Sequence, residues 1–176
     1  MAGRLTPTPV VLEAILVSPV HAYEGRPTDP PGPPPTPLDQ VEVHADLGLL
    51  GDRYYNHPAH RTAAVTLLSL DALDEVARAL ATPLDPFRTR RNLLLRGFPV
   101  DTLAATRTTP GALFTLDTGT GPLRFRAHRP ASPCRWMDTQ LADGAFRALR
   151  GRAGVRCTPL DSGTLSTGPA TLEVLT

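Results

Sequence analysis

Cys134 is the residue of this sequence whose surroundings best suit chemistry. Arg129 and Arg135 lie close to it along the chain, and a helix is predicted to begin just after it. Positive charge and a helix N-terminus both stabilise a thiolate, which can act as a nucleophile, carry sulfur or ligate a soft metal. The alternative is a buried, unreactive thiol. That alternative is favoured for Cys157, the second cysteine, because it lies in a strand of alternating polarity.

Arginines crowd a second candidate site, where four of them fall within the nine residues from Arg88 to Arg96. Arg90, Arg91 and Asn92 stand near its centre, where a predicted loop enters a strand. Guanidinium groups bind phosphate or carboxylate oxygens bidentately, so the segment suits an anion such as a phosphate. A solvated run of charge, paired with acidic side chains elsewhere, is the alternative interpretation.

A turn from Gly48 to Arg53 is the third candidate. Its two glycines permit a tight backbone approach to a ligand or to another strand, and Asp52 and Arg53 could orient a bound group. A plain turn with a structural aspartate cap explains the same residues. His57 and His60 follow at a spacing that could suit a metal, but the sequence offers no convincing third ligand.

The composition excludes several classes of function. With 18 basic and 17 acidic residues the net charge is +1, which gives no field for a dedicated nucleic-acid-binding protein. Every basic residue is arginine, so the chain can form neither a covalent pyridoxal phosphate adduct nor a lysine-containing phosphate loop. Two cysteines make no disulfide framework, and Glu13 interrupts the only apolar run near the N-terminus. We therefore expect a cytoplasmic protein without a membrane segment.

The elements that must position these residues are mostly short strands. A helix is predicted after Ser69, with an apolar stripe of Leu70, Leu73, Ala77 and Leu80 that ends before Pro83. A second helix is predicted over 138–149, interrupted by Gly144. Strands are predicted at 10–17, 41–45, 64–68, 93–95, 112–117, 123–128, 155–160 and 171–175, with turns around Ser162 and Ser166.

The stretch from Pro27 to Pro37 contains seven prolines and should be an extended surface loop. A proline-rich ligand for a partner domain is a less favoured interpretation. About eight short strands and two helices favour a mainly β fold, a closed or nearly closed barrel with peripheral helices. We expect one domain over residues 1–176.

These pieces, in this order, resemble the MOSC domain, which is named for the C-terminal domain of molybdenum cofactor sulfurase. The resemblance is to small stand-alone bacterial members and runs from about Val10 to Val174. Two positions depart from the family pattern, because Tyr54 replaces a histidine and Pro169 follows Gly168 where an aspartate is common. The matching motifs are Gly48–Arg53, Val65–Ser69, Arg90–Leu93 with Gly97, Pro133-Cys134, Arg150–Gly154, Ser162-Gly163 and Gly168.

The resemblance implies a β-barrel that binds molybdenum cofactor. It implies that Cys134 ligates molybdenum or carries sulfur, and that Arg90, Arg91 and Asn92 lie by the pocket for the pterin phosphate. Asp52 and Arg53 would line that pocket. The leading hypothesis is a reductase of small N-hydroxylated substrates, which receives electrons from a separate protein. The alternatives are a persulfide carrier loaded by a cysteine desulfurase, and a cofactor-binding protein without catalysis.

Overall fold

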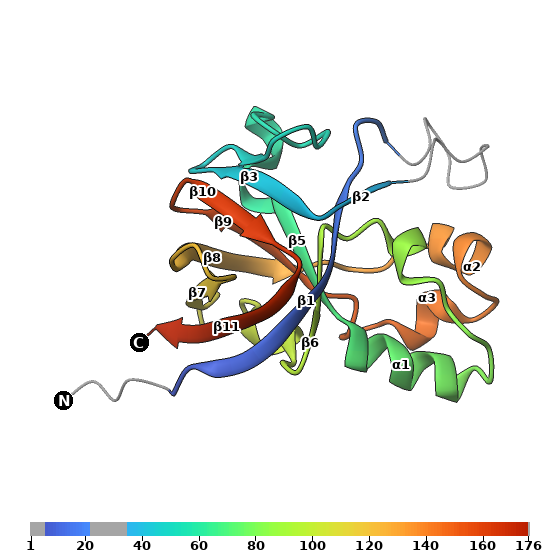
Figure 1. Cartoon of the computed structure of the whole chain (residues 1–176). Helices are drawn as coiled ribbons and strands as arrows, with labels where there is room; N and C mark the ends of the chain where they lie inside the picture. Colours follow the sequence, from blue (N-terminus) through green and yellow to red (C-terminus); the bar gives the residue numbers. More distant parts are fainter. Residues whose placement is uncertain (1–5, 22–34, 176) are drawn as a thin grey trace.

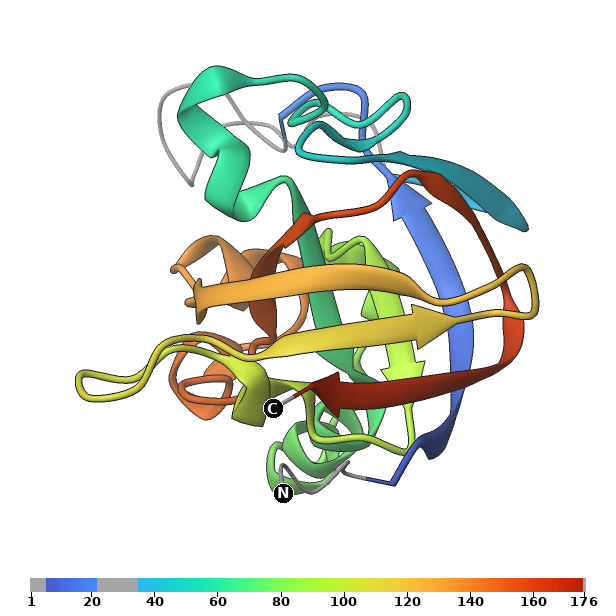
Figure 2. The same ribbon diagram turned by 90° about the vertical axis from the view of Figure 1, so that its left-hand side faces the viewer.

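A closed barrel of seven strands dominates the computed structural model, which describes residues 6–21 and 35–175. Its strands run in the order β11-β7-β8-β9-β5-β6-β1, and a pairing between β1 and β11 closes the ring. Figure 2 shows β7 and β8 (yellow to orange) crossing the front, with β11 (dark red) below them and β1 (blue) at the side. The predicted mainly β barrel is therefore confirmed. The strands are β1 (Thr8–Val17), β5 (Val65–Ser69), β6 (Leu93–Arg96), β7 (Leu113–Asp117), β8 (Leu123–Pro130), β9 (Val155–Pro159) and β11 (Gly168–Leu175).

Alternating apolar side chains fill the barrel. Along β9 and β7 every second residue is buried, as expected for a strand with one face in a core. Phe114 and Phe125 stack at the centre with their ring centroids 5.5 Å apart. Cys157 also lies in this core, fully buried.

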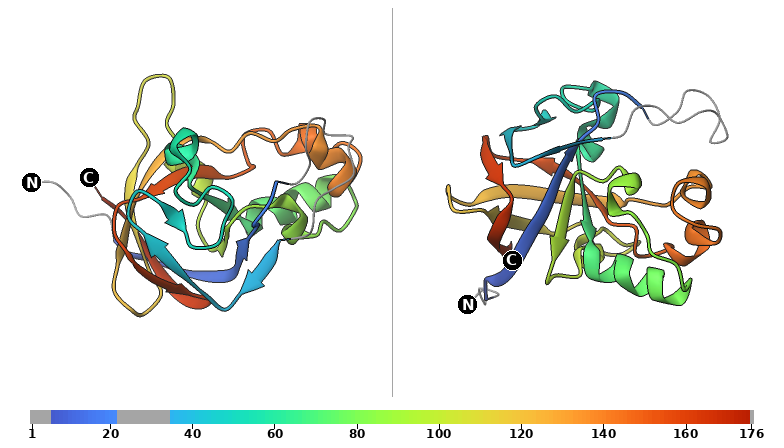
Figure 3. Two further views of the ribbon diagram at one scale, coloured as in Figure 1. Left: turned by 90° about the horizontal axis from the view of Figure 1, so that it is seen from above. Right: turned by 45° about the vertical axis from the view of Figure 1, so that its right-hand side comes forward.

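A second core lies outside the barrel, between its wall and the helices. α1 (Leu70–Ala79) connects β5 to β6, which are parallel neighbours. The Ser69 hydroxyl caps this helix by accepting the N–H of Ala72 at 3.3 Å. Figures 1 and 3 show α1, α2 and α3 gathered on one side of the barrel. None of the helices in 6–21 and 35–175 is long and apolar enough to cross a membrane.

One residue of the predicted apolar stripe of α1 was predicted wrongly. Leu70 and Leu73 are buried as predicted, but the third buried position is Val76 and not Ala77. The helix gives way to its C-cap at Leu80, three positions before Pro83.

The single helix predicted over 138–149 is wrong. The structure has two short helices, α2 (Trp136–Gln140) and α3 (Ala145–Ala148). Gly144 separates them with a φ of +86°, a conformation that ends helical geometry. The Asp138 carboxylate reaches across the break and accepts the N–H of Phe146 at 2.7 Å.

Three short strands lie where the sequence predicted loops or turns. β2 (Thr36–Leu38) pairs with the end of β1, although it includes Pro37, the last proline of the predicted loop. Its place at the sheet edge explains this, because an edge strand tolerates a missing N–H. Residues 27–34 of that loop lie outside the described part of the chain. The other two strands are β4 (Gly48–Leu49) and β10 (Gly163–Ser166), which flank β3 (Gln40–His44) in a second sheet.

Candidate functional site: an arginine pocket

Four arginines from distant parts of the sequence surround one cavity of about 160 Å³. Arg53 follows β4, Arg90 and Arg91 lie just before β6, and Arg156 projects from β9. They meet because β5 pairs with both β6 and β9, which brings the start of β6 close to the middle of β9. We call this cavity the arginine pocket. Its remaining walls are Tyr54, His60, Ala63, Thr66, Asn92 and Ala131.

Asn92 and Asp52 form the buried frame behind the pocket. The Asn92 side-chain oxygen accepts the backbone N–H and the hydroxyl of Thr66, both at 2.9 Å. Its amide nitrogen donates to the Leu16 carbonyl and to the Asp52 carboxylate, both at 3.1 Å. Asp52 also accepts the backbone N–H groups of Ser18 and Tyr54. Their polar atoms are thus engaged with protein, and both residues hold the turn beside Arg53 against β1 and β5.

Arg91 connects two loops near the pocket through hydrogen bonds to their backbone carbonyls. Its Nε donates to the Ala153 carbonyl at 2.9 Å, and its Nη2 donates to the Ala131 carbonyl at 3.0 Å. Burial, and then the charge of Arg156, lowers the pKa of the Arg91 guanidinium to about 10. Arg91 therefore fixes the chain segment that leads to Cys134.

Arg90 adopts left-handed backbone geometry with a φ of +56°. For a residue other than glycine this costs about 1–2 kcal/mol, so neighbouring contacts must hold it in place. One such contact is the donation from Nη2 of Arg90 to the Val20 carbonyl at 2.7 Å. Burial, and then the charge of Arg53, lowers the pKa of Arg90.

Arg53 offers hydrogen-bond donors that the described protein atoms do not use. Its Nε and Nη1 atoms are buried, and neither has a hydrogen-bond partner within residues 6–21 and 35–175. Nη1 lies 3.9 Å from Asp52, an electrostatic contact too long for a hydrogen bond. The guanidinium carbon stacks 4.5 Å from the ring centroid of Tyr54. A buried donor without an acceptor costs about 1–3 kcal/mol, so an anion in the pocket would relieve a real penalty.

His60, which lines the arginine pocket, packs against Tyr54 and His57. The His60 ring lies 4.3 Å from Tyr54 and 4.6 Å from His57, measured between centroids. Burial lowers the pKa of His60, and the charges of His57, His21, Arg156 and Arg53 lower it further. Within the described part of the chain no three His, Cys, Asp or Glu side chains are grouped to hold a metal, so the His57–His60 metal site gains no support.

Cys134 lies on the other side of Arg91, in the loop between β8 and α2. It is partly buried and packs against the helical core. The thiol lies near enough to Arg91 that its negative form would raise the pKa of that guanidinium. Cys134 is not among the residues that line the arginine pocket. The other thiol, Cys157, behaves as predicted for an unreactive residue, because complete burial raises its pKa.

The structure brings four of the five predicted cofactor-binding residues to one place, with Asp52 directly behind them. Arg156, Tyr54 and His60 were not predicted to join them. Arg156 did carry a signal, because it alternates with Val155 and Cys157 and so had to point away from the barrel core. No local pattern in the sequence indicates which other residues Arg156 would meet.

Comparisons with known proteins agree with this fold. A family model described as the MOSC domain matches residues 54–170, which include Arg90–Asn92, Cys134 and Arg156, while Asp52 and Arg53 lie just before it. The YuaD protein of Bacillus subtilis is 15% identical, with a TM-score of 0.69 over 100% of both chains. YiiM of Geobacillus stearothermophilus is 16% identical, with a TM-score of 0.61 over 95% of this chain and 75% of its own.

A third crystal structure, of a hypothetical protein, is 17% identical with a TM-score of 0.64, over 97% of this chain and 69% of its own. At these identities the likeness shows the fold alone. No curated protein matches the chain in sequence. The family model covers well over half of the 176 residues. The chain therefore belongs to the MOSC domain family.

Proposed function

We propose that this protein binds molybdenum cofactor, with the cofactor's phosphate in the arginine pocket and Cys134 as a thiolate ligand to molybdenum. The observation that carries the proposal is the pair of buried donors on Arg53 that have no hydrogen-bond partner among the described residues. Arg53 lines a cavity together with three further guanidinium groups, and this lining suits an anion.

The donor set fits the two chemically distinct ends of the cofactor. A cavity of about 160 Å³ walled by arginines suits a phosphate group, so the rest of the cofactor would extend beyond it. Molybdenum prefers soft sulfur ligands, and the cofactor brings dithiolene sulfurs of its own. One protein thiolate then suffices, and the absence of a three-residue metal cluster within 6–21 and 35–175 is no obstacle.

The residues in and around the arginine pocket would have different roles, according to where they lie. Arg53, Arg90 and Arg156 would contact the anion directly, and His60 also lines the pocket. Asp52 and Asn92 would act as positioning residues, since protein atoms already engage their polar groups. Arg91 would hold the loop that carries Cys134 and contribute its charge to the pocket.

The proposed reaction is the reduction of a small N-hydroxylated substrate. When bound, the cofactor supplies a metal centre that can remove an oxygen atom in a two-electron step. Cys134 would hold that centre on the protein, and Arg53, Arg90 and Arg156 would fix its orientation through the phosphate. The chain itself would need electrons from a separate donor protein.

The test is the molybdenum and oxidised-pterin content of protein purified from a host that makes the cofactor. Wild type should carry both at close to one per chain. Cys134→Ser should lose molybdenum, and Arg156→Gln should lose both. Cys157→Ala serves as the matched thiol control and should keep both, because its thiol lies in the barrel core. Wild-type protein without either component would contradict the proposal.

Partial exposure of Cys134 supports a second candidate, a persulfide carrier. The thiol does not line the arginine pocket, and it is exposed enough for a partner protein to reach it. Incubation with a cysteine desulfurase and free cysteine, without reductant, should then add the mass of one sulfur atom to wild type but not to Cys134→Ser. A carrier without catalysis would instead retain pterin in Cys134→Ser and lose it in Arg156→Gln.

A further inference from the structure

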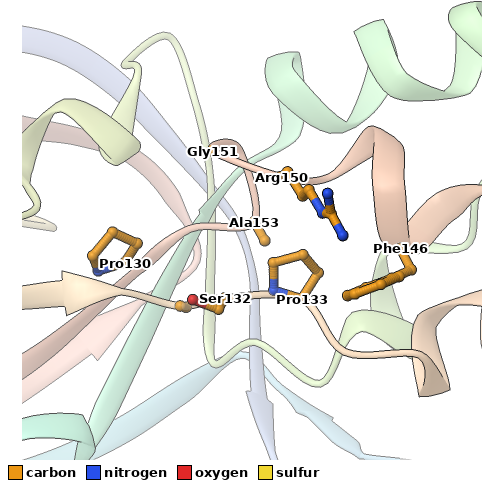
Figure 4. Close-up of a pocket in the computed structure, with 8 residues that line it drawn as sticks. Pro130, Ser132, Pro133, Phe146, Arg150, Gly151 and Ala153 are labelled. Carbon is orange, nitrogen blue, oxygen red and sulfur yellow. The ribbon is translucent and has the colours of Figure 1, made fainter.

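A second ligand site can be recognised on the helical side of the molecule. A cleft of about 410 Å³ opens between the chain segment 130–133 and the segment from Phe146 to Ala153. Its lining is mostly apolar, with Pro130, Pro133 and Phe146 as its larger apolar side chains. Figure 4 shows the ring of Pro133 beside the ring of Phe146, with the Arg150 side chain above both. Such walls suit a flat, apolar body.

A second cleft of about 380 Å³ adjoins the first and is strongly basic. Phe146 and Arg150 line both, and Arg135 and Arg147 complete the basic wall of the second. The guanidinium carbon of Arg150 lies 5.0 Å from the ring centroid of Phe146, which places the charge where the two clefts join. We call the two together the helical cleft.

The three arginines of the helical cleft have no salt bridge to an acidic residue in the described part of the chain. Among the described residues, no carboxylate lies within 4.0 Å of the guanidinium nitrogens of Arg135, Arg147 or Arg150. Asp138 also lines the cleft, but one of its oxygens accepts the backbone N–H of Phe146. Other arginines of this chain do find such partners, as Arg96 does with Glu13, Asp71 and Asp74. The cleft therefore carries positive charge beside an apolar wall.

We infer that the helical cleft binds a small organic anion with a flat, apolar body. The body would lie against Pro133 and Phe146, and its carboxylate or other anionic group would meet Arg150 and Arg147. Pro133 and Arg135, which line the two parts of the cleft, are the sequence neighbours of Cys134, although the Cys134 thiol lines neither part. The further step that this ligand is the substrate rests on the proposed function. The binding of the ligand to the cleft does not depend on that function.

The experiment measures binding of benzoate to the purified full chain by ligand-observed NMR, with uncharged benzamide as the matched probe. We expect benzoate to bind at ~10 mM or below and benzamide to bind about tenfold more weakly. Arg150→Gln should weaken benzoate binding about tenfold, because a charged hydrogen bond is lost. Arg107→Gln, an exposed arginine that lines neither part of the cleft, should leave it unchanged.

Three outcomes would overturn the inference. The first is no binding of benzoate to wild type at ~10 mM. The second is equal benzoate binding by wild type and Arg150→Gln, and the third is equal binding of benzoate and benzamide to wild type. Arg156→Gln separates this site from the arginine pocket, because it should weaken binding of inorganic phosphate and leave benzoate binding intact. Protein that binds benzoate but carries no molybdenum would refute the proposed function and leave this site standing.

Discussion

Asn92 illustrates how a single side chain can hold a site without touching its ligand. It makes four hydrogen bonds to β1, β5 and the turn that carries Asp52, and it is almost completely buried. Asn92 was predicted from the sequence to bind the cofactor, yet its polar atoms make hydrogen bonds to the protein. If an Asn92 variant lost the cofactor, displacement of the turn that carries Asp52 would explain the loss as well as a missing contact between Asn92 and the cofactor would.

We predict that Asn92→Ala lowers the free energy of unfolding by about 3 kcal/mol, because buried partners on three segments lose their hydrogen bonds. Urea denaturation followed by circular dichroism measures this. Gln40→Ala is the control, since Gln40 is exposed in β3, and should change stability by less than about 0.5 kcal/mol. If Asn92→Ala lowered the free energy of unfolding by less than about 1 kcal/mol, the hydrogen bonds of Asn92 would not be what holds these segments together.

At the scale of elements, the site depends on loops that pass extremely close to the barrel. Gly154 precedes β9 with a φ of +96°, and a Cβ atom there would lie 2.0 Å from the Leu67 carbonyl oxygen. Its neighbour Ala153 supplies the carbonyl that Arg91 binds. The close approach of this loop to β5 therefore fixes the position of one of the two carbonyls that hold Arg91.

Gly154→Ala should cost about 3 kcal/mol or more, since neither the backbone angle nor the contact with β5 can be kept. Gly151→Ala is the matched control, because its φ is +76° but no atom lies within 4 Å of the added Cβ. That change should cost only about 1 kcal/mol. Thermal unfolding of the two variants compares them, and equal costs would contradict this account of the loop.

The elements also show what could be predicted from the sequence. Strands such as β7 and β8 alternate in polarity, and the order of motifs matched a known family, so the barrel was predictable. The split of α2 from α3 was not, because Gly144 can either interrupt a helix or end it. The sequence also did not predict that Arg156 lines the same pocket as Arg53, since this depends on β5 pairing with β9, its neighbour in the barrel wall. Pairing between strands so distant in sequence leaves no local signal.

At the scale of the whole molecule, three partly desolvated histidines make stability depend on pH. Burial lowers the pKa of His60, His128 and His21 below the ordinary value of 6.5. Charges of the same sign add to this, from Arg126 at His128 and from Arg53 at His21 and His60. Below pH 6.5 the unfolded chain then binds more protons at these sites than the folded chain does. Folding is therefore penalised as the pH falls through that range.

The urea concentration at the midpoint of unfolding should accordingly decrease when the pH is lowered from 7.5 to 5.5. The double variant His60→Gln with His128→Gln should show a smaller fall, because two of the three groups no longer titrate. Urea titrations of both proteins at a series of pH values give the comparison. A midpoint that rises on acidification, or an unchanged slope in the double variant, would contradict it.

Closure of the barrel also constrains how the chain can fold during synthesis. β1 begins at Thr8, yet one of its two pairing edges is completed by β11, whose last residue is Leu175. Until the ribosome has synthesised β11, the N–H and C=O groups along that edge of β1 remain without their β11 partners. A polypeptide in this state could pair with a second nascent chain. Rapid completion of translation, or a chaperone that covers β1, would protect the yield of folded protein.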